Sequence, residues 1–266
     1  MHGKGALTDS LIHPSAIIDP SAELGSGVEV GPFAIIEAGV QIGARTRIGA
    51  YTRLAGPTSI GEDNHIHSHC SIGEAPQDKK YRGQPTRLEI GHRNTIREFC
   101  TLNRGTAEDL AYTQVGDDNW IMAYVHIAHD CTVGSHTVLA NHATLAGHVH
   151  IGDWVTLGGF VGVHQFVQVG AHSFCGISAV ITQDIPPFML IAGNPAAPRG
   201  INSEGLKRRG YSTDAITEIK NAYRALYRNG LSYEEAQVQI ATLAEHTPEL
   251  KVMVEFLAGS TRGILR

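Results

Sequence analysis

Aliphatic residues recur at every sixth position along most of this 266-residue chain. The first run comprises Ile12, Ile18, Leu24, Val30, Ile36, Ile42, Ile48, Leu54, Ile60, Ile66 and Ile72. The spacing returns in Ile90, Ile96 and Leu102, and again in Val115, Ile121, Ile127, Val133, Leu139, Leu145, Ile151, Leu157, Val163 and Val169. A helix needs apolar residues at about every third or fourth position, so the pattern excludes one over residues 12 to 182. It predicts short strands joined by sharp corners.

Three such hexads would close one triangular coil of 18 residues. Stacked coils lie about 4.8 Å apart, with the aliphatic side chains inside a narrow prism. Because that interior has no room for a substrate, we expect chemistry on the outer faces or in a groove between prisms, which favours a symmetric oligomer. Breaks in the repeat near residues 73–87 and 103–114 predict loops extruded from the prism.

Beyond residue 198 the apolar residues change to helical spacing. Ser212 or Thr213 can cap a first helix, Ser232 with Glu235 forms a capping box for a second, and Pro248 begins a third. We therefore predict three parts: an N-terminal extension (1–11), a mainly β repeat domain (12–198) and a C-terminal helical domain (199–266).

The charge balance limits the kind of partner. Lys and Arg number 21 against 26 Asp and Glu, a net charge of −5, which excludes a strongly basic nucleic-acid binder. No apolar run approaches the roughly 18 residues of a membrane span, and no signal-peptide segment follows the first residues, so we expect a cytoplasmic protein. The four cysteines form no CxxC pair and are expected to be reduced, packed thiols.

Adding 18 to a residue number identifies the residue stacked on it in the next coil. His129 is thus followed by Gly147 and Gln165, and Asp130 is followed by His148, roughly 5 Å per step. A neutral imidazole held by Asp130 or a backbone carbonyl is a suitable general base near neutral pH. The backbone N–H of a glycine one coil above can approach a developing oxyanion with no side chain in the way. The spacing therefore predicts a reactive cluster at one edge of the prism.

Six motifs in chain order carry a resemblance that the repeat alone could not support. They run from His126 to Cys131, Leu145 to His148, Val163 to Phe166, Gly193 to Pro195, Glu204 to Gly210 and Ser260 to Gly263. With the helical tail, they resemble the UDP-N-acetylglucosamine O-acyltransferase family of lipid A biosynthesis over nearly the whole chain. The resemblance implies a left-handed parallel β-helix and a homotrimer with active sites between subunits. It also implies transfer of an (R)-3-hydroxyacyl group from acyl carrier protein to the glucosamine 3-hydroxyl of UDP-N-acetylglucosamine, without metal or cofactor.

The same resemblance assigns roles to individual residues. His129 would be the general base, Asp130 would orient it, and Gly147 would offer its backbone N–H to the thioester oxyanion. The substrate residues would be Asp78, His126 and His148 around the sugar and its N-acetyl group, Lys80 along the groove, His164, and Gln165, Asn202, Glu204, Arg208 and Arg209 around the nucleotide. Asn103 stands where many members of the family have His, and Pro195 stands where some have His, so both are left out of the catalytic set.

Two further expectations concern the acyl donor. Ile177 lies two coils and two hexads beyond His129, on a different face and about 12 to 13 Å further along the axis. By resemblance it would act as a ruler that favours a chain near ten carbons over fourteen; the alternative is a core packing residue. Lys220, Arg224 and Arg228 share one face of the expected helix, a candidate docking patch for the acidic carrier protein or else an ordinary solvated face.

Two other enzymes are kept as alternatives, and a non-catalytic scaffold is disfavoured. The related UDP-3-O-acylglucosamine N-acyltransferase normally carries a separate domain before its repeats, whereas here the repeat begins at Ile12. A zinc carbonic anhydrase of the same fold would use three histidines at a subunit interface. A non-catalytic repeat scaffold would have no use for the polar cluster around His129.

Overall fold

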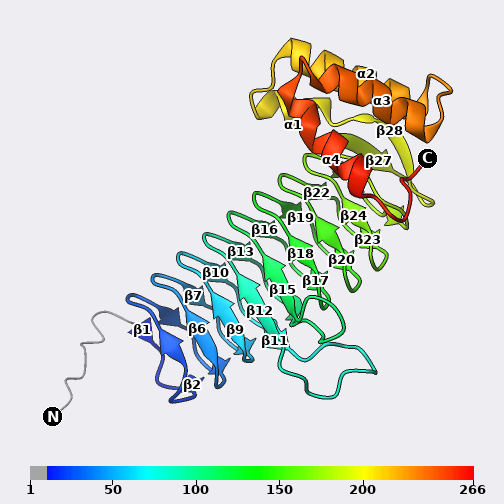
Figure 1. The fold of residues 1–266 in the computed structure, drawn as a ribbon. Coiled ribbons are helices and arrows are strands. Elements are labelled where there is room, and N and C mark those ends of the chain that lie inside the picture. Colours follow the sequence, from blue (N-terminus) through cyan, green and yellow to red (C-terminus); the bar gives the residue numbers. More distant parts are fainter. Residues whose placement is uncertain (1–10) are drawn as a thin grey trace.

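The computed structural model describes residues 11–266, in which short parallel strands stack into a three-sided prism (Figure 1). Strands of adjacent coils pair in register, so that Ile127 lies beside Leu145 and Leu145 beside Val163. These partners are 18 residues apart, as the hexad repeat requires. The predicted left-handed parallel β-helix of hexapeptide repeats, followed by a helical C-terminal part, is confirmed.

The strands form three sheets, one for each side of the prism. Sheet A contains β1 (Leu11–Ile12), β4 (Glu29–Val30), β7 (Arg47–Ile48), β10 (His65–Ile66), β13 (Thr95–Ile96), β16 (Trp120–Ile121), β19 (Val138–Leu139), β22 (Thr156–Leu157), β25 (Phe174–Cys175), β27 (Met189–Ala192) and β28 (Ala197–Ile201). Sheet B contains β2 (Ile17–Ile18), β5 (Ile35–Ile36), β8 (Arg53–Leu54), β11 (Ser71–Glu74), β14 (Thr101–Asn103), β17 (His126–Ile127), β20 (Thr144–Leu145), β23 (Gly162–Val163) and β26 (Val180–Ile181). Sheet C contains β3 (Glu23–Leu24), β6 (Val40–Ile42), β9 (Thr58–Ile60), β12 (Arg87–Ile90), β15 (Tyr112–Val115), β18 (Thr132–Val133), β21 (His150–Ile151) and β24 (Gln168–Val169).

The aliphatic residues of the repeat fill the axis of the prism. Ile66, Ile127 and Leu145 are fully buried, whereas Ile12 in the first coil is 39% exposed. Ile12 has a neighbouring described coil on one side only, which accounts for its exposure. Burying one such side chain contributes about 1.5–3 kcal/mol, so the stacked ladders supply most of the cohesion of the prism.

From Gly27 onward, most corners hold one residue in the left-handed backbone region. Asp130, His148 and Phe166 occupy such positions on one corner, with φ values of 58°, 63° and 64°. This conformation is uncommon outside glycine, and Asp and His adopt it more readily than most residues. The corner between sheets B and C therefore presents polar and aromatic side chains in a vertical row.

Both interruptions of the repeat become irregular connections. One joins β11 to β12 and the other joins β14 to β15. The Asn103 side-chain amide donates to the Ala75 carbonyl at 2.8 Å, and the Arg104 guanidinium donates to the Gly73 carbonyl at 2.8 Å. These bonds hold the two connections against each other on one side of the prism.

The C-terminal part packs at the end of the prism opposite to β1 (Figure 1). Its helices are α1 (Ser203–Arg208), α2 (Thr213–Tyr227), α3 (Tyr233–Ala244), the short 3₁₀ helix η1 (Pro248–Leu250) and α4 (Lys251–Gly259). Ser212 caps α2, and the capping box of Ser232 and Glu235 opens α3, both as predicted.

The sequence did not predict two features next to these helices. α1, capped by Asn202, is one, and the antiparallel pairing of β27 with β28 is the other. β28 runs through the proposed domain border at residue 198. The proposed N-terminal extension, residues 1–11, lies outside the described residues except for Leu11.

Two simpler expectations can be compared directly with residues 11–266. None of the helices described there has the length and apolar character needed to cross a membrane. Cys70, Cys100, Cys131 and Cys175 are free and buried, so the prediction of packed thiols is confirmed.

Candidate active site

His129 and Asp130 form a hydrogen-bonded pair at the corner between β17 and β18. The Asp130 carboxylate accepts the Nδ1–H of His129 at 2.9 Å. It also accepts the Thr106 backbone N–H at 3.0 Å and the Thr106 hydroxyl at 2.7 Å. Because a carboxylate only accepts, the His129 proton sits on Nδ1 and Nε2 keeps its lone pair. The pair has the arrangement of an oriented general base.

The environment keeps the carboxyl group ionised. Asp130 is fully buried, which on its own raises the pKa, but hydrogen bonds from His129 and Thr106 outweigh burial and the pKa is lowered below its usual value. Beside it, burial and then the neighbouring His129 lower the pKa of His126. His126 is therefore a neutral ring near pH 7, and it shares a hydrogen bond of 2.7 Å with the Thr101 hydroxyl.

Gly147 lies directly above the His129 ring, as the 18-residue spacing predicts. A Cβ built on Gly147 would be 2.6 Å from His129 Cε1 and 2.8 Å from Nε2, so no side chain fits there. In the hydrogen bonds of residues 11–266, the Gly147 N–H has no acceptor. A free backbone N–H beside a basic Nε2 can donate to a negative charge that develops at a reacting carbonyl.

His148 lies above Asp130, again as the spacing predicts. Its ring stacks on Phe166 with centroids 4.3 Å apart and meets the His129 ring edge-on at 5.0 Å. Its Nδ1 lies 2.6 Å from Oδ2 of Asp109.

His129, Asp130 and His148 are also the described residues whose ligand atoms could hold a metal ion, since these atoms lie within 4.8 Å of one another. Both oxygens of Asp130 already accept hydrogen bonds from Thr106. A cation would have to compete with those bonds for the carboxylate. The three residues therefore suit a general base, His129, with an orienting carboxylate, Asp130, better than a metal ion.

The predicted nucleotide residues of the C-terminal part line one cavity of about 710 Å³. Asn202, Glu204, Arg208 and Arg209 border it together with Trp154. Arg208 is exposed. Arg209 is held over the Trp154 ring at 5.2 Å and donates to the Trp154 carbonyl at 2.9 Å.

Asn202 and Glu204 are engaged within the chain. The Asn202 side chain caps α1 by accepting the Gly205 N–H, and it donates to the His172 carbonyl at 2.8 Å. Glu204 forms an exposed ion pair with Lys207 at 2.9 Å.

His164 and Gln165 do not line that cavity, although Gln165 was grouped with it by resemblance. Both are exposed and follow β23, on the corner that also carries His129 and Gly147. The Gln165 carbonyl accepts the Arg262 guanidinium at 2.9 Å. Within one chain, the predicted nucleotide group is thus divided between two corners of the prism.

In the described chain, the side chain of the loop residue Asp78 bonds only within its own loop, whereas Lys80 also reaches the second loop. The Asp78 side chain accepts the Lys80 backbone N–H at 2.9 Å, and the Lys80 ammonium lies 3.4 Å from Glu108. Glu108 adjoins Asp109, the residue in contact with His148. The two loops therefore approach the same side of the site.

Two residues expected to serve the acyl donor are at the surface. Ile177 is 70% exposed and packs beside Gly159, which excludes the core-packing alternative for the single chain. Lys220 and Arg224 are exposed on α2, and Arg228 is exposed at its C-cap; these three residues are called here the α2 basic face.

The chain was compared with known proteins. A family model described as UDP-N-acetylglucosamine O-acyltransferase, domain 2, matches residues 184–265, and a bacterial transferase hexapeptide model matches residues 39–74 and 112–147. The acyl-[acyl-carrier-protein]--UDP-N-acetylglucosamine O-acyltransferase of Burkholderia lata is 56% identical over 96% of this chain and 99% of its own length. The chain belongs to the UDP-N-acetylglucosamine O-acyltransferase family. The enzyme of that name from a Janthinobacterium species is also 56% identical, over 97% of this chain and all of its own length.

Solved structures of this O-acyltransferase family share the fold. LpxA from Acinetobacter baumannii has a TM-score of 0.94 and 44% identity, covering 96% of this chain and all of that one. The UDP-N-acetylglucosamine acyltransferase of Francisella novicida has a TM-score of 0.94 and 40% identity, covering 96% and 94%.

Thr106 and Asp109 are site residues of this O-acyltransferase family member that sequence reasoning missed. Both lie in the connection between β14 and β15, where the six-residue register is lost and the stacking rule does not apply. The connection carries two acids, Glu108 and Asp109, and an acidic pair in a loop beside a predicted site is the signal that could have found Asp109.

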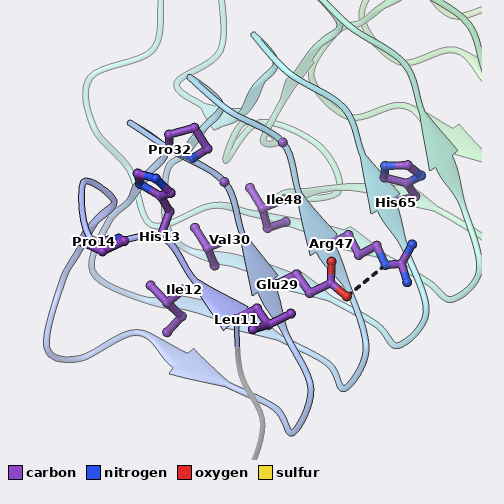
Figure 2. A pocket seen from close by; sticks show the side chains of 12 residues that line it. Leu11, Ile12, His13, Pro14, Glu29, Val30, Pro32, Arg47, Ile48 and His65 are labelled. Atoms are coloured by element: carbon purple, nitrogen blue, oxygen red, sulfur yellow. Dashed lines mark ion pairs between the residues drawn. The ribbon is translucent and has the colours of Figure 1, made fainter.

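A second cavity, of about 660 Å³, lies over the first coils (Figure 2). Its lining includes Leu11, Val30 and Ile48, and an ion pair of 3.3 Å joins Arg47 to Glu29. No residue of the predicted site borders it, and it lies at the end of the prism away from the helices.

Proposed function

We propose that this chain transfers an (R)-3-hydroxyacyl group from acyl carrier protein to the 3-hydroxyl of UDP-N-acetylglucosamine, an early step of lipid A biosynthesis. One observation carries the proposal most directly. Among the described residues, neither Nε2 of the His129–Asp130 pair nor the adjacent N–H of Gly147 has a hydrogen-bond partner. Relatives of 56% identity over nearly the full length, which bear the name of this activity, support it.

The reaction follows from these groups. The His129 Nε2 takes the proton of the sugar 3-hydroxyl as its oxygen attacks the thioester carbonyl carbon. The buried Asp130 carboxylate stabilises the imidazolium that forms. The Gly147 N–H donates to the oxyanion of the tetrahedral intermediate. When the C–S bond breaks, the carrier thiolate leaves and takes the proton back from His129, so that the base is regenerated.

The remaining site residues would bind the acceptor. Asp78, His126 and His148 are assigned to the sugar and its N-acetyl group, Lys80 would line the groove, and His164 would contact the substrate. Within residues 11–266 no hydrogen bond engages the guanidinium of the exposed Arg208, so its donors could bind a diphosphate. Arg209 is tied to Trp154, so its contribution is a fixed positive charge beside the nucleotide.

We infer that the enzyme is a homotrimer with each site between two subunits. Two observations support this. The nucleotide group is split between two corners of one chain, and a second chain would bring the corners together. In addition, a third corner carries a column of stacked, largely exposed rings, among them Phe33, Tyr51 and Phe160, which suits contact with protein.

The acyl donor would use two other surfaces. Ile177, exposed on the corner between sheets A and B, would block the far end of the acyl groove and favour a chain near ten carbons. The α2 basic face would attract the acidic carrier protein. A cytoplasmic location suits both substrates and stays a prediction.

The experiment that tests this function supplies the wild-type protein with a series of hydroxyacyl carrier proteins. Acceptors are UDP-N-acetylglucosamine and, as the N-acyltransferase alternative, UDP-3-O-acylglucosamine. The expected product is an ester at the 3-hydroxyl of the first acceptor, located by NMR. Acylation of the second acceptor at nitrogen, with none of the first, would contradict the proposal.

A further inference from the structure

The connection between β14 and β15 reaches the His148 imidazole directly and the His129 imidazole through Asp130. Thr106 holds Asp130, which holds His129, and Asp109, three residues further along, holds His148. Neither the repeat nor the proposed mechanism gives Asp109 a role. We propose that Asp109 is a positioning residue that fixes the tautomer of His148, so that His148 Nε2 accepts a hydroxyl or amide N–H of the acceptor sugar. This inference rests on the proposed function for the identity of the sugar.

The contact determines where the His148 proton lies. Asp109 Oδ2 is 2.6 Å from Nδ1, and an ionised carboxylate can only accept. Nδ1 therefore carries the hydrogen, and Nε2 of the neutral ring carries the lone pair. The His148 side chain is only 13% exposed, whereas the Asp109 side chain is 41% exposed. A largely exposed loop carboxylate therefore bonds to a ring that is mostly buried.

The surroundings of Nε2 leave it available to a ligand. Its nearest carboxylate oxygen, Oδ2 of Asp130, is 4.0 Å away, which is beyond hydrogen-bonding distance. That carboxylate already accepts from Thr106 and His129. Within residues 11–266, no hydrogen bond engages His148 Nε2.

Packing fixes the plane of the His148 ring but not its tautomer. Phe166 stacks on one face with an interplanar angle of 10°, and the His129 ring meets it at 89°. Neither ring distinguishes Nδ1–H from Nε2–H. Asp109 is the group that makes this distinction, just as Asp130 makes it for His129.

The result is a pair of acceptors with different tasks. His129 and His148 each donate through Nδ1 to a carboxylate and each present a free Nε2. One Nε2 removes the proton of the reacting hydroxyl, and the other would accept a neighbouring donor, either the N-acetyl amide N–H or a second hydroxyl. A substrate with two adjacent hydrogen-bond donors fits this pair, and an amino sugar acylated at nitrogen has them.

The test is a double-mutant cycle with an adjacent control. Asp109→Ala, His148→Gln and the double variant are compared by kcat/KM at low UDP-N-acetylglucosamine, with Asp109→Asn as the conservative variant. We expect Asp109→Ala to lower kcat/KM about tenfold, mainly by raising KM, and Asp109→Asn to recover part of the loss because its amide oxygen can still accept. The double variant should fall within about twofold of His148→Gln alone.

Glu108→Gln provides the matched control. Glu108 is the preceding acid in the same loop, and it pairs with Lys80 instead of His148. Its effect should multiply with that of His148→Gln, whatever its size. If the effect of Asp109→Ala also multiplies with that of His148→Gln, Asp109 does not act through the ring and the proposal is overturned.

The His148 tautomer can be read without any assay of activity. In histidine-labelled protein, ¹⁵N NMR should show His148 as the Nδ1–H form in wild type and a shift toward Nε2–H in Asp109→Ala. Observation of Nε2–H in the wild type refutes the positioning role. Failure of acyl transfer by the wild type would instead refute the proposed function and leave the NMR result standing.

Discussion

Replacing Gly147 by Ala tests the stacking of Gly147 on the ring of His129, the proposed general base. The new Cβ would lie 2.6 Å from His129 Cε1 and 2.8 Å from Nε2. Carbon atoms pack at about 3.5–4.0 Å, so the ring has to retreat by about 1 Å. That movement takes Nε2 away from the acceptor hydroxyl and strains the 2.9 Å bond to Asp130. A displacement of about 1 Å at a reacting group costs about a hundredfold in rate.

The assay is steady-state acyl transfer, with circular dichroism and the thermal midpoint to confirm the fold. We expect kcat to fall about a hundredfold although the backbone N–H of residue 147 is retained. Gly162→Ala is the matched control, because a Cβ at that strand glycine meets nothing within 4 Å. If Gly147→Ala keeps more than about a third of the wild-type kcat, the placement of this glycine over the catalytic ring does not matter for the reaction and the reasoning fails.

Three further predictions concern stability, chain length and docking. Burial, and then Arg209, lower the pKa of His172 to about 4, so below about pH 6.5 the unfolded chain binds a proton that the folded chain does not bind. The free energy of unfolding should therefore fall by about 2 kcal/mol between pH 7 and 4, allowing for the partial exposure of the ring. Denaturant titrations should show a smaller dependence of this free energy on pH for His172→Gln. Ile177→Gly should shift the preference from about ten carbons toward longer hydroxyacyl chains in a competition assay, and an unchanged preference would contradict the ruler assignment. Charge reversal of the α2 basic face should raise KM for the acyl carrier substrate at low salt, with a smaller effect at high salt and no change in nucleotide affinity; equal effects at both salt concentrations would refute docking there.

The sequence predicts the prism well because its fold depends on one local rule. Each aliphatic side chain at a sixth position is buried along the axis of the prism. The 18-residue coil then determines which residues stack on one another. His129 with Gly147, and Asp130 with His148, could be paired from residue numbers alone for this reason.

The rule fails where the register is lost. Thr106 and Asp109 come from a connection of irregular length, so nothing in their numbering places them beside His129 and His148. The short helix α1 was missed because six residues give too little periodicity, and its cap, Asn202, was interpreted only as a nucleotide ligand. The position of Gln165, away from the cavity of Arg208, follows from the three-sided cross-section and could not be obtained from motif order.

The central claim is that His129 is the general base of acyl transfer. The most direct test is the single-turnover rate of transfer to UDP-N-acetylglucosamine by wild type and by His129→Ala, using protein whose thermal unfolding shows both variants to be folded. The account predicts that His129→Ala loses at least about a thousandfold in rate while it still binds the sugar nucleotide. A variant that binds the acceptor and transfers the acyl group within about tenfold of the wild-type rate would show that another group removes the proton.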